Sequence, residues 1–369
     1  MSLIVDGTTG VTFNDSSLQG AAASPYVLKN RIINGDMRID QRNAGASVSV
    51  DNTERFVVDR FLIRSNATGL SATSQQSTTV PNNFVNSIIV SVTTGGTIAA
   101  ATRGYIQQRI EGYNVADLGW GASGASTVTL SFWVRSSKTG TFSGALQNDP
   151  TLGNRSYVFT YSISSANTWE QKSITITGDT TGTWYKNNLT GINVMFDLGN
   201  GSDLRTATTG SWVAGDYRGA NSSVNIFDTS GATFYITGVQ LEIGTSATPF
   251  ERRLYNQELA NCQRYFEMSY SQGTVPGTAT NVGGQNAVGA GVNDVGTTSY
   301  YKATKRTSPT ITVYSPSTGT SGAIRNFNTG SDITGVSTEV GDTGFRVYKA
   351  GAITAGQYYA YQYIASAEL

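Results

Sequence analysis

The sequence predicts a mainly β protein: an antiparallel jelly-roll sandwich, a short junction helix, and a second, smaller C-terminal β-sandwich domain. Hydrophobic residues make up 38% of the 369 residues and alternate with polar ones over many short segments, the period of a half-buried strand. Gly, Asn, Asp or Ser bounds each segment, and these residues favour turns. No helical pattern separates the segments before residue 249, so the strands should be antiparallel.

The composition excludes several classes of function. Lys plus Arg and Asp plus Glu both number 25, so the balanced charge gives no electrostatic footprint for nucleic acid or for an anionic membrane. The chain has no histidine, which removes Ser-His-Asp catalysis and the commonest metal ligand. Cys262 is its one cysteine, so neither an internal disulfide nor a cysteine zinc site is expected. We therefore predict a protein that is not an enzyme.

Two further patterns concern location. No apolar run is long enough to span a bilayer, so membrane insertion is not expected. The first residues show no basic segment followed by an apolar run, so no signal peptide is expected. These patterns favour a protein that is made in a cytoplasm and functions elsewhere.

Residues 1–29 form a short polar segment. Ile4-Val5 and Val11-Thr12-Phe13 flank a Gly- and Thr-rich stretch, which predicts two short strands around a turn. So short a piece cannot bury a core alone. We expect it to dock on a partner or to remain a flexible arm.

Residues 30–249 carry the most persistent alternation, and we assign them to the jelly-roll domain. The segment Val128–Val134 alternates apolar and polar residues throughout, as a strand with one buried face does. In the closing segment, Phe234 and Ile236 fall out of phase with Val239, Leu241 and Ile243. Since a slip of one residue moves side chains to the opposite face, we predict a β-bulge at Gly238.

A junction helix is predicted over residues 250–268. Thr248-Pro249-Phe250-Glu251 fits a capping box with proline at the first helical position. Apolar residues then recur at spacings of 4, 3 and 4 and form one stripe: Tyr255, Leu259, Cys262 and Phe266. A helix this short must pack on something. Two packings stay open: against its own sandwich, or against two further copies at a trimer axis, which would make the stripe an oligomer interface.

Residues 269–369 are assigned to a distal β-domain. Its clearest strands contain Ile311 with Val313, Phe345 with Val347, and the terminal run from Tyr358 to Ile364. Because that last strand is apolar on both faces, it should be central in its sheet. Tyrosines are concentrated in this domain, and aromatic rings with neighbouring polar groups suit recognition surfaces. The candidates for receptor or glycan binding are Tyr300, Tyr301, Tyr314, Tyr348 and Tyr358.

The sequence alone identifies neither a catalytic site nor a metal site. The acids considered are Asp36, Asp40, Asp59, Glu242 and Glu251, but nothing sets any two of them across a cleft as a glycosidase requires. No catalytic residue, metal ligand or cofactor is therefore predicted. A structural Ca²⁺ stays open as an alternative, since Asn30, Asn34, Asp36 and a later acid could be adjacent across the sheet.

Three separated blocks resemble tailed-bacteriophage fibre and tail proteins that open on a carbohydrate-binding-module-like jelly roll. The first block is the Asn30–Asn43 segment, which contains Asn34-Gly35-Asp36. The second runs from Gly238-Val239-Gln240-Leu241-Glu242 through Pro249-Phe250-Glu251-Arg252-Arg253 to Phe266. The third comprises Arg306–Pro316 and the terminal Ala367-Glu368-Leu369.

The resemblance implies a homotrimeric virion fibre located in the phage particle, in its tail. Residues 1–29 would attach to other virion proteins, and the distal part would meet a host surface glycan or protein. It also implies that modules of this fold carry a structural calcium near the Asn-Gly-Asp opening. Three alternatives remain open: a capsid (head) fibre or decoration protein, a tailspike polysaccharide depolymerase, and a bacterial carbohydrate-binding module.

Overall fold

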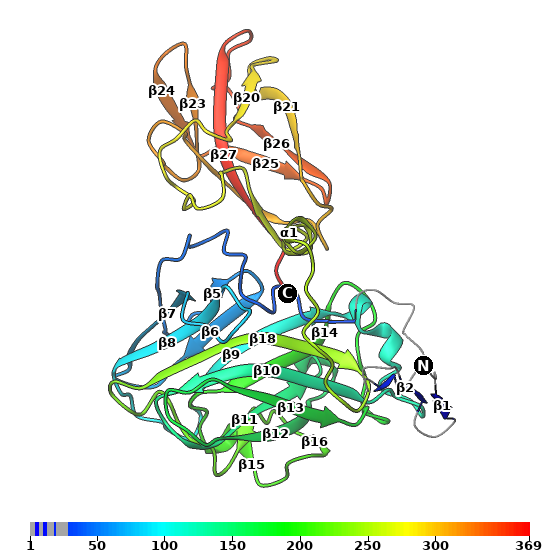
Figure 1. Cartoon of the computed structure of the whole chain (residues 1–369). Helices are drawn as coiled ribbons and strands as arrows, with labels where there is room; N and C mark the ends of the chain where they lie inside the picture. Colours follow the sequence, from blue (N-terminus) through cyan, green and yellow to red (C-terminus); the bar gives the residue numbers. More distant parts are fainter. Residues whose placement is uncertain (1–3, 7–9, 13–17, 20–28) are drawn as a thin grey trace.

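The structure, a computed structural model, describes residues 4–6, 10–12, 18–19 and 29–369 (Figure 1). Two large antiparallel sheets form a sandwich within residues 30–249. A smaller β unit, residues 266–369 and here called the distal unit, stands beyond helix α1 in Figure 1. The expected mainly β class is confirmed.

The first large sheet of the sandwich has six strands and contains the closing strand β18. Its order across the sheet is β13 (Glu170–Ile176), β10 (Val128–Ser136), β18 (Thr233–Ile243), β8 (Ser87–Thr94), β7 (Ser71–Ser77) and β4 (Val48–Ser49). The second large sheet has seven strands, in the order β16 (Trp212–Ala214), β12 (Arg155–Ile163), β11 (Gly140–Gln147), β14 (Thr190–Asp197), β9 (Gly104–Glu111), β6 (Phe61–Ser65) and β5 (Arg55–Val58).

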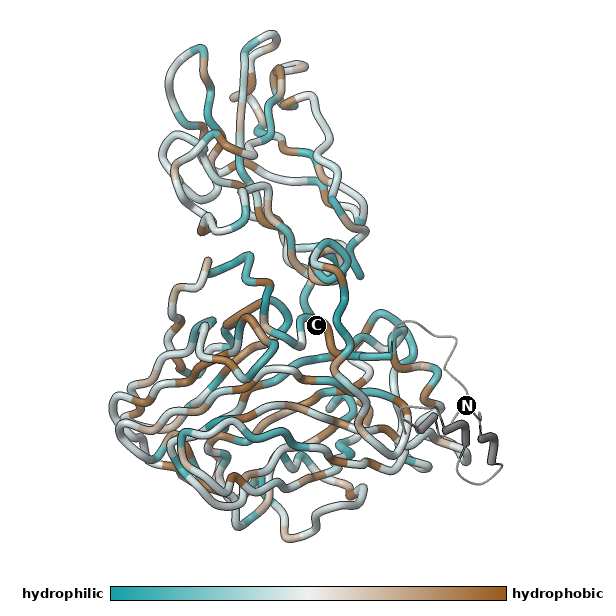
Figure 2. The backbone as a smooth tube through the Cα atoms, in the orientation of Figure 1, coloured by the Kyte–Doolittle hydropathy of each residue, from teal (hydrophilic) through white to brown (hydrophobic). Residues whose placement is uncertain are grey.

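One hydrophobic core lies between these two sheets. Phe132 of β10 makes edge-to-face contacts with Tyr161 and Phe196 of the facing sheet, each at 5.0 Å between ring centroids. Figure 2 shows hydrophobic residues recurring along the strands. In the strand predicted at Val128–Val134, Val128, Leu130, Phe132 and Val134 are fully buried as predicted, but Thr129 and Ser131 on the opposite face are buried as well.

The predicted β-bulge at Gly238 is confirmed. Ser131 of β10 pairs with Gln240 of β18, whereas Trp133 pairs with Thr237, so β18 has one extra residue there. Gly238 has φ 63°, a conformation in which glycine carries no steric penalty. The bulge lets β18 bury apolar residues on both sides of it in the same core, with the exception of Ile243, which is exposed at the strand end.

The distal unit is organised around β27 (Tyr358–Ser366), which confirms the predicted central strand. Four strands pair with it: β19 (Phe266–Met268), β20 (Gln285–Val288), β22 (Thr310–Tyr314) and β23 (Ala323–Asn326). Beside β23 lies β24 (Ser331–Thr334), and a separate three-stranded sheet has the order β21 (Asp294–Tyr300), β26 (Gly344–Tyr348) and β25 (Ser337–Val340). Phe345 packs edge-to-face on Tyr363 at 4.9 Å in the core of this unit.

The remaining elements are short. Near the start of the chain, β1 (Ile4–Asp6) pairs with β2 (Gly10–Thr12) as predicted, and β3 (Leu18–Gln19) adds an unpredicted third strand. Whether residues 1–29 dock on a partner lies outside the described residues. The long segment 199–221 contains a parallel pair, β15 (Arg205–Thr206) and β17 (Gly219–Ala220). Single 3₁₀ turns lie at Gly112–Asn114, Ala116–Leu118, Pro150–Leu152 and Ser202–Leu204.

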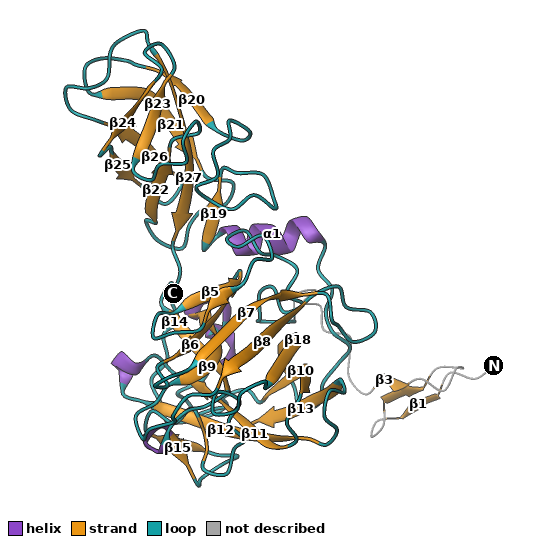
Figure 3. Ribbon diagram, turned by 90° about the vertical axis from the view of Figure 1, so that its left-hand side faces the viewer, coloured by secondary structure: helices purple, strands orange, loops and turns teal. Residues whose placement is uncertain are grey.

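The predicted junction helix is shorter than expected: α1 spans only Tyr255–Gln263, between the two units (Figure 3). The prediction of a capping box at Thr248 is wrong. The Thr248 N–H donates to Glu242, and no side chain caps α1, whose N-cap is Leu254. Phe266 lies in β19 rather than on the helix. No helix within the described residues is long and apolar enough to cross a membrane.

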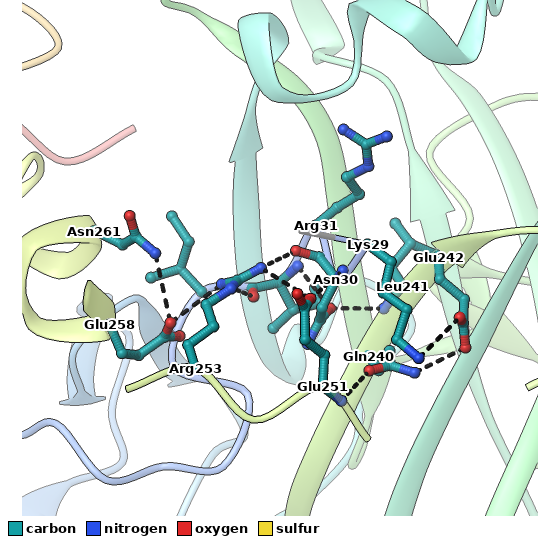
Figure 4. A network of polar contacts seen from close by, with 12 residues as sticks. Lys29, Asn30, Arg31, Gln240, Leu241, Glu242, Glu251, Arg253, Glu258 and Asn261 are labelled. Atoms are coloured by element: carbon teal, nitrogen blue, oxygen red, sulfur yellow. Dashed lines mark hydrogen bonds and ion pairs between the residues drawn. The ribbon is translucent and has the colours of Figure 1, made fainter. Parts of the chain in front are cut away.

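The sequence 249–254 stays extended because its charged residues tie together distant segments (Figure 4). Arg253 donates to the backbone oxygens of Asn30 and Ile32 and pairs with Glu258 of α1 at 3.2 Å. Glu251 accepts the Asn30 N–H at 2.6 Å. The first residues of the sandwich, its closing strand and the helix therefore form one buried polar network.

The apolar stripe of α1 packs inside its own chain. Cys262 is fully buried with Ile33, Ile39 and Tyr265, and Phe266 is also buried. The interface prediction is corrected for Cys262 and Phe266, because their buried side chains leave no surface that a second chain could contact. Tyr255, at 42% exposed, and the half-buried Leu259 remain interface predictions.

Cys262 is expected to be inert to a thiol reagent in the folded protein. Burial raises the pKa of its thiol well above the usual value, so little thiolate is present to react. Titration with Ellman's reagent at pH 8 should give no colour before urea unfolds the chain and one equivalent afterwards. Rapid reaction of the native protein would contradict this packing.

Buried ion pairs also hold the distal unit to the sandwich; we call them the junction. Glu368, just after β27, pairs with Arg42 at 2.6 Å and with Arg60. The Arg60 guanidinium lies 3.6 Å from the centre of the Tyr265 ring. Arg264 pairs with Glu111 of β9 at 2.6 Å. The two units are therefore joined by side chains from several segments and not by one linker.

Candidate functional site

Strand β9 presents a row of polar side chains on the outer face of the seven-stranded sheet. Ile106 and Ile110 point into the core, so Tyr105, Gln107 and Arg109 point to the opposite face. These three pair across to β14 at Asp197, Met195 and Asn193 respectively, and Gln147 of β11 pairs with Asn193 on the other side. The register thus gathers polar groups from three neighbouring strands.

These side chains form the floor of a cavity of about 350 Å³, here called the sheet groove. Its lining residues are Glu54, Arg64, Arg103, Tyr105, Gln107, Arg109, Gln147, Asp149, Pro150, Thr190, Asn193, Met195, Arg218 and Leu369. Next to it, Tyr217 packs on Ala145 and Val158 and so covers the neighbouring part of the sheet. The segment 199–221 thereby leaves only part of this face open.

One buried acceptor in the floor lacks a partner. The Gln107 side-chain N–H donates to Asn193 Oδ1 at 2.6 Å, and Asn193 donates in turn to the Asn148 oxygen at 3.0 Å. The Gln107 Oε1 atom is buried and accepts no hydrogen bond from residues 29–369. An unsatisfied buried acceptor costs about 1–3 kcal/mol. Its position in the floor therefore favours a ligand or water molecule that donates to it.

Most arginines of the groove are held by protein partners. Arg218 donates to both carboxylate oxygens of Asp216 at 2.9 Å. Burial opposes the ionisation of Asp216, but these bonds outweigh burial and hold its pKa below the usual value. Arg109 is bound by Glu54 and by the Leu369 oxygen, each at 2.6 Å.

Arg103 differs from the other arginines of the groove. Within residues 29–369 its guanidinium takes part in none of the assigned hydrogen bonds or ion pairs, although it is only half-exposed. Five N–H donors in a fixed fork are thus open to a ligand. Together with Gln107 Oε1, the groove offers both free donors and a free acceptor.

The five tyrosines predicted as a recognition surface are not brought together. Tyr300 is 76% and Tyr358 46% exposed, but they lie on β21 and β27, in different sheets. Tyr301 stacks on Phe345, and Tyr314 packs edge-to-face on Tyr270. Tyr348 pairs with Asp294 at the end of β21 opposite Tyr300. A common tyrosine surface is therefore absent, and a contact role for Tyr300 or Tyr358 remains a prediction.

The oxygens considered for calcium are used by the protein itself. Asn30 Oδ1 accepts the N–H groups of Ile32 and Leu241, and Asn34 Oδ1 accepts that of Ile39. Asp36 pairs with Arg38 at 2.5 Å. Within the described part of the chain, no three His, Cys, Asp or Glu side chains are grouped to hold a metal. These asparagines instead brace the start of the sandwich.

The other acids considered for catalysis are also engaged, and none lines the sheet groove. Asp40 accepts the Asn43 and Gly45 N–H groups, and Glu242 accepts from Thr248. Asp59 is buried between Gln41 and Arg42 at the junction. The groove itself holds Glu54 and Asp149, of which Glu54 is paired with Arg109.

No protein-family model matches the chain, and no curated protein sequence matches it. Among solved structures, the enzymatically active domain of bacteriophage CBA120 tailspike protein 4 is 15% identical, with a TM-score of 0.32, over 61% of this chain and only 22% of that chain. A family 11 carbohydrate-binding module from Clostridium thermocellum is 13% identical over 55% and 98% of the two chains, with a TM-score of 0.28. The CBM22-2 xylan-binding domain from Paenibacillus barcinonensis is 15% identical over 59% and 100%, with a TM-score of 0.29. At these TM-scores the likeness carries no functional argument.

Proposed function

We propose that this chain is a non-catalytic glycan-binding protein and that the sheet groove holds the saccharide. The observation that carries the proposal is that one cavity is lined by the buried, unpartnered Gln107 Oε1 and by the uncommitted Arg103 guanidinium. A sugar hydroxyl both donates and accepts, so it can satisfy the first atom and receive a bond from the second. Gln147 and Asn193 also line the groove, where protein partners hold both amides in place on the sheet.

We further propose that this binding serves a phage particle, with the chain acting as a virion fibre of the tail. The support is the resemblance of the Asn34-Gly35-Asp36 opening and of the Gly238–Phe266 block to such proteins. In this proposal the fibre is a homotrimer, residues 1–29 attach it to other virion proteins, and the distal unit meets the host surface. Imaging of particles labelled through this chain should place the label on the tail; label on the head would favour a capsid fibre or decoration protein.

A tailspike depolymerase is the enzymatic alternative. If the chain only binds, purified protein will release no reducing sugar from a polysaccharide that it retains. Release of reducing sugar would overturn the non-catalytic proposal and leave the binding site intact as a substrate site.

Replacement of Arg103 by methionine is expected to weaken glycan binding at least tenfold, about 1.4 kcal/mol. The guanidinium makes none of the hydrogen bonds or ion pairs assigned within residues 29–369, and its charge only adds to the lowering of the Asp216 pKa by Arg218, so its loss should remove ligand contacts with little effect on the fold. A glycan array screened with the labelled protein identifies the best ligand, and calorimetry then compares the affinities. The matched control is Arg135→Met, since Arg135 lies on the other sheet, stacked on Tyr235 at 4.8 Å. No binding by the wild type, or equal affinities of wild type and Arg103→Met, would overturn the proposal.

A further inference from the structure

A second cavity lies on the outer face of the opposite sheet, around the bulge of β18. It measures about 840 Å³, within the range of small-molecule sites. We call it the bulge pocket. Its lining residues are Asn82, Asn83, Phe84, Trp133, Gln171, Ala247, Thr248, Pro249, Phe250 and Arg252. The pocket shares no residue with the sheet groove.

The missing side chain of Gly238 makes room for two aromatic rings. A Cβ atom at this position would lie 2.7 Å from Phe84 Cζ and 3.1 Å from Trp133 Cδ1. Both rings therefore rest directly against the bulged backbone. Around the bulge, β18 pairs with β10 on one side, and on the other the Val239 N–H donates to the Gly35 oxygen at 2.9 Å, so the platform under these rings is braced from both sides.

A third ring and one arginine complete the aromatic wall. Phe250 packs edge-to-face on Phe84, with 5.3 Å between centroids. The Arg252 guanidinium lies 4.7 Å from the Phe84 centroid and donates to the Asn83 oxygen. Rings supplied by three separate segments are thus fixed in place before any ligand arrives, which reduces the ordering cost of binding.

The rings remain half-exposed although they are held in place. Around them stand the exposed amides of Asn82, Asn83 and Gln171, whose side chains make no assigned hydrogen bond with residues 29–369. A pyranose has C–H faces that pack on aromatic rings and a rim of hydroxyls that both donate and accept. The pocket presents the matching surfaces, an apolar platform with amides at its edge.

We propose that the bulge pocket binds a neutral saccharide, independently of the sheet groove. No Asp or Glu lines the pocket, and its one charged residue, Arg252, is engaged with the Phe84 ring and with Asn83. The pocket therefore favours a ligand that carries hydroxyls but no formal charge. The lining contains no Leu, Ile, Val or Met, and Ala247 and Pro249 supply its only aliphatic side chains, so it offers little of the aliphatic surface that a packed protein segment would fill.

Fluorine NMR of protein labelled with 5-fluorotryptophan tests the proposal on the full chain. Of the five tryptophans, three form a packed cluster with centroids 4.8–5.2 Å apart: Trp120, Trp184 and Trp212. Trp169 packs on Tyr235 outside the bulge pocket. Titration with cellotetraose, xylotetraose, mannotetraose and maltotetraose should shift the Trp133 resonance saturably with at least one of them. The other four resonances should stay in place.

Variants then locate the site. In calorimetric titrations, Trp133→Ala should weaken binding of that sugar at least tenfold and the exposed Gln171→Ala about threefold, whereas Trp169→Ala should leave it unchanged. Gln171→Ala keeps the test valid if Trp133→Ala fails to fold. Absence of a saturable shift of the Trp133 resonance with all four sugars, or an undiminished calorimetric affinity of Gln171→Ala and Trp133→Ala, overturns the proposal. A shift that depends on protein concentration without sugar overturns it in favour of a second copy of the chain. Because none of these variants changes a residue of the sheet groove, the two sites can fail separately.

Discussion

Replacement of Lys305 by methionine is expected to lower the free energy of unfolding of the distal unit by about 3–5 kcal/mol. Lys305 and Glu267 form an ion pair at 2.5 Å in which both side chains are fully buried. Removing the ammonium leaves the Glu267 carboxylate in the interior without its countercharge, although Tyr363 Oη at 2.8 Å and the Lys302 N–H at 2.9 Å still donate to it. These two neutral donors cannot replace a charge.

Lys305 also binds backbone at the start of the unit, which adds to the expected loss. Its Nζ donates to the Gln263 oxygen at 2.5 Å and to the Ala303 oxygen at 3.0 Å. Burial lowers the pKa of Lys305, and the Glu267 charge only partly opposes that effect. The end of α1, strand β19 and the segment before β22 therefore depend on one ammonium group.

Urea unfolding followed by circular dichroism measures this effect. The matched control is Arg346→Met, because the Arg346–Glu339 pair at 2.9 Å is exposed and such pairs contribute about 0–1 kcal/mol. The double variant Lys305→Met/Glu267→Gln should recover part of the loss, since it buries no unpaired charge. A loss for Lys305→Met no larger than that of Arg346→Met would contradict this account of the pair.

The second large effect concerns pH and Asp59. Burial raises the pKa of this carboxyl from 3.8 to about 6, against the opposing charge of Arg42 and the hydrogen bond from Gln41, while Glu368 and Asp40 raise it further. Because the folded state binds the proton more tightly than the unfolded state, lowering the pH from about 6 to about 4 stabilises the folded state through this group. The pKa difference corresponds to a contribution of about 3 kcal/mol.

Comparison of the wild type with Asp59→Asn between pH 4 and pH 7 isolates this contribution. The free energy of unfolding of the wild type minus that of the variant should rise by about 2.4 kcal/mol as the pH falls from 7 to 4, because the rest of the contribution appears only below the unfolded-state pKa of 3.8. Carboxyls whose pKa is lowered, such as Glu111 and Asp179, lose stabilisation in acid, but they are common to both proteins and cancel. A difference that is constant with pH, or that falls in acid, would contradict the assignment.

The sequence allowed prediction of those features that depend on local pattern. Alternation of apolar and polar residues located the strand at Val128–Val134. In the separate segment 234–243, the apolar residues change phase at Gly238, and a strand can bury both halves of such a pattern only with an extra residue, which located the bulge. The central position of β27 followed from apolar residues on both of its faces. Each of these conclusions needs only neighbouring residues.

Features that depend on distant partners were missed. The spacing of Thr248 and Glu251 fits a capping box. In the structure, however, the Thr248 hydroxyl donates to Glu242 and the Glu251 carboxylate accepts the Asn30 N–H, so neither side chain caps a helix and α1 begins later, at Tyr255. The sheet groove lies on β9, β14 and β11, and the sequence does not reveal that these three strands are neighbours. A signal was present in β9, where Tyr105, Gln107 and Arg109 alternate with apolar Ile106 and Ile110 and predict a polar outer face. The pairing of Lys305 with Glu267, by contrast, leaves no local pattern.

The junction has a mechanical consequence. A pulling force applied to the distal unit enters β27, which is hydrogen-bonded along its length to strands on both sides. Just after β27, Glu368 is anchored to two arginines of the sandwich, and Arg264 is paired with Glu111 of β9. Tension between the two units would therefore be shared by several ion pairs as well as by the backbone.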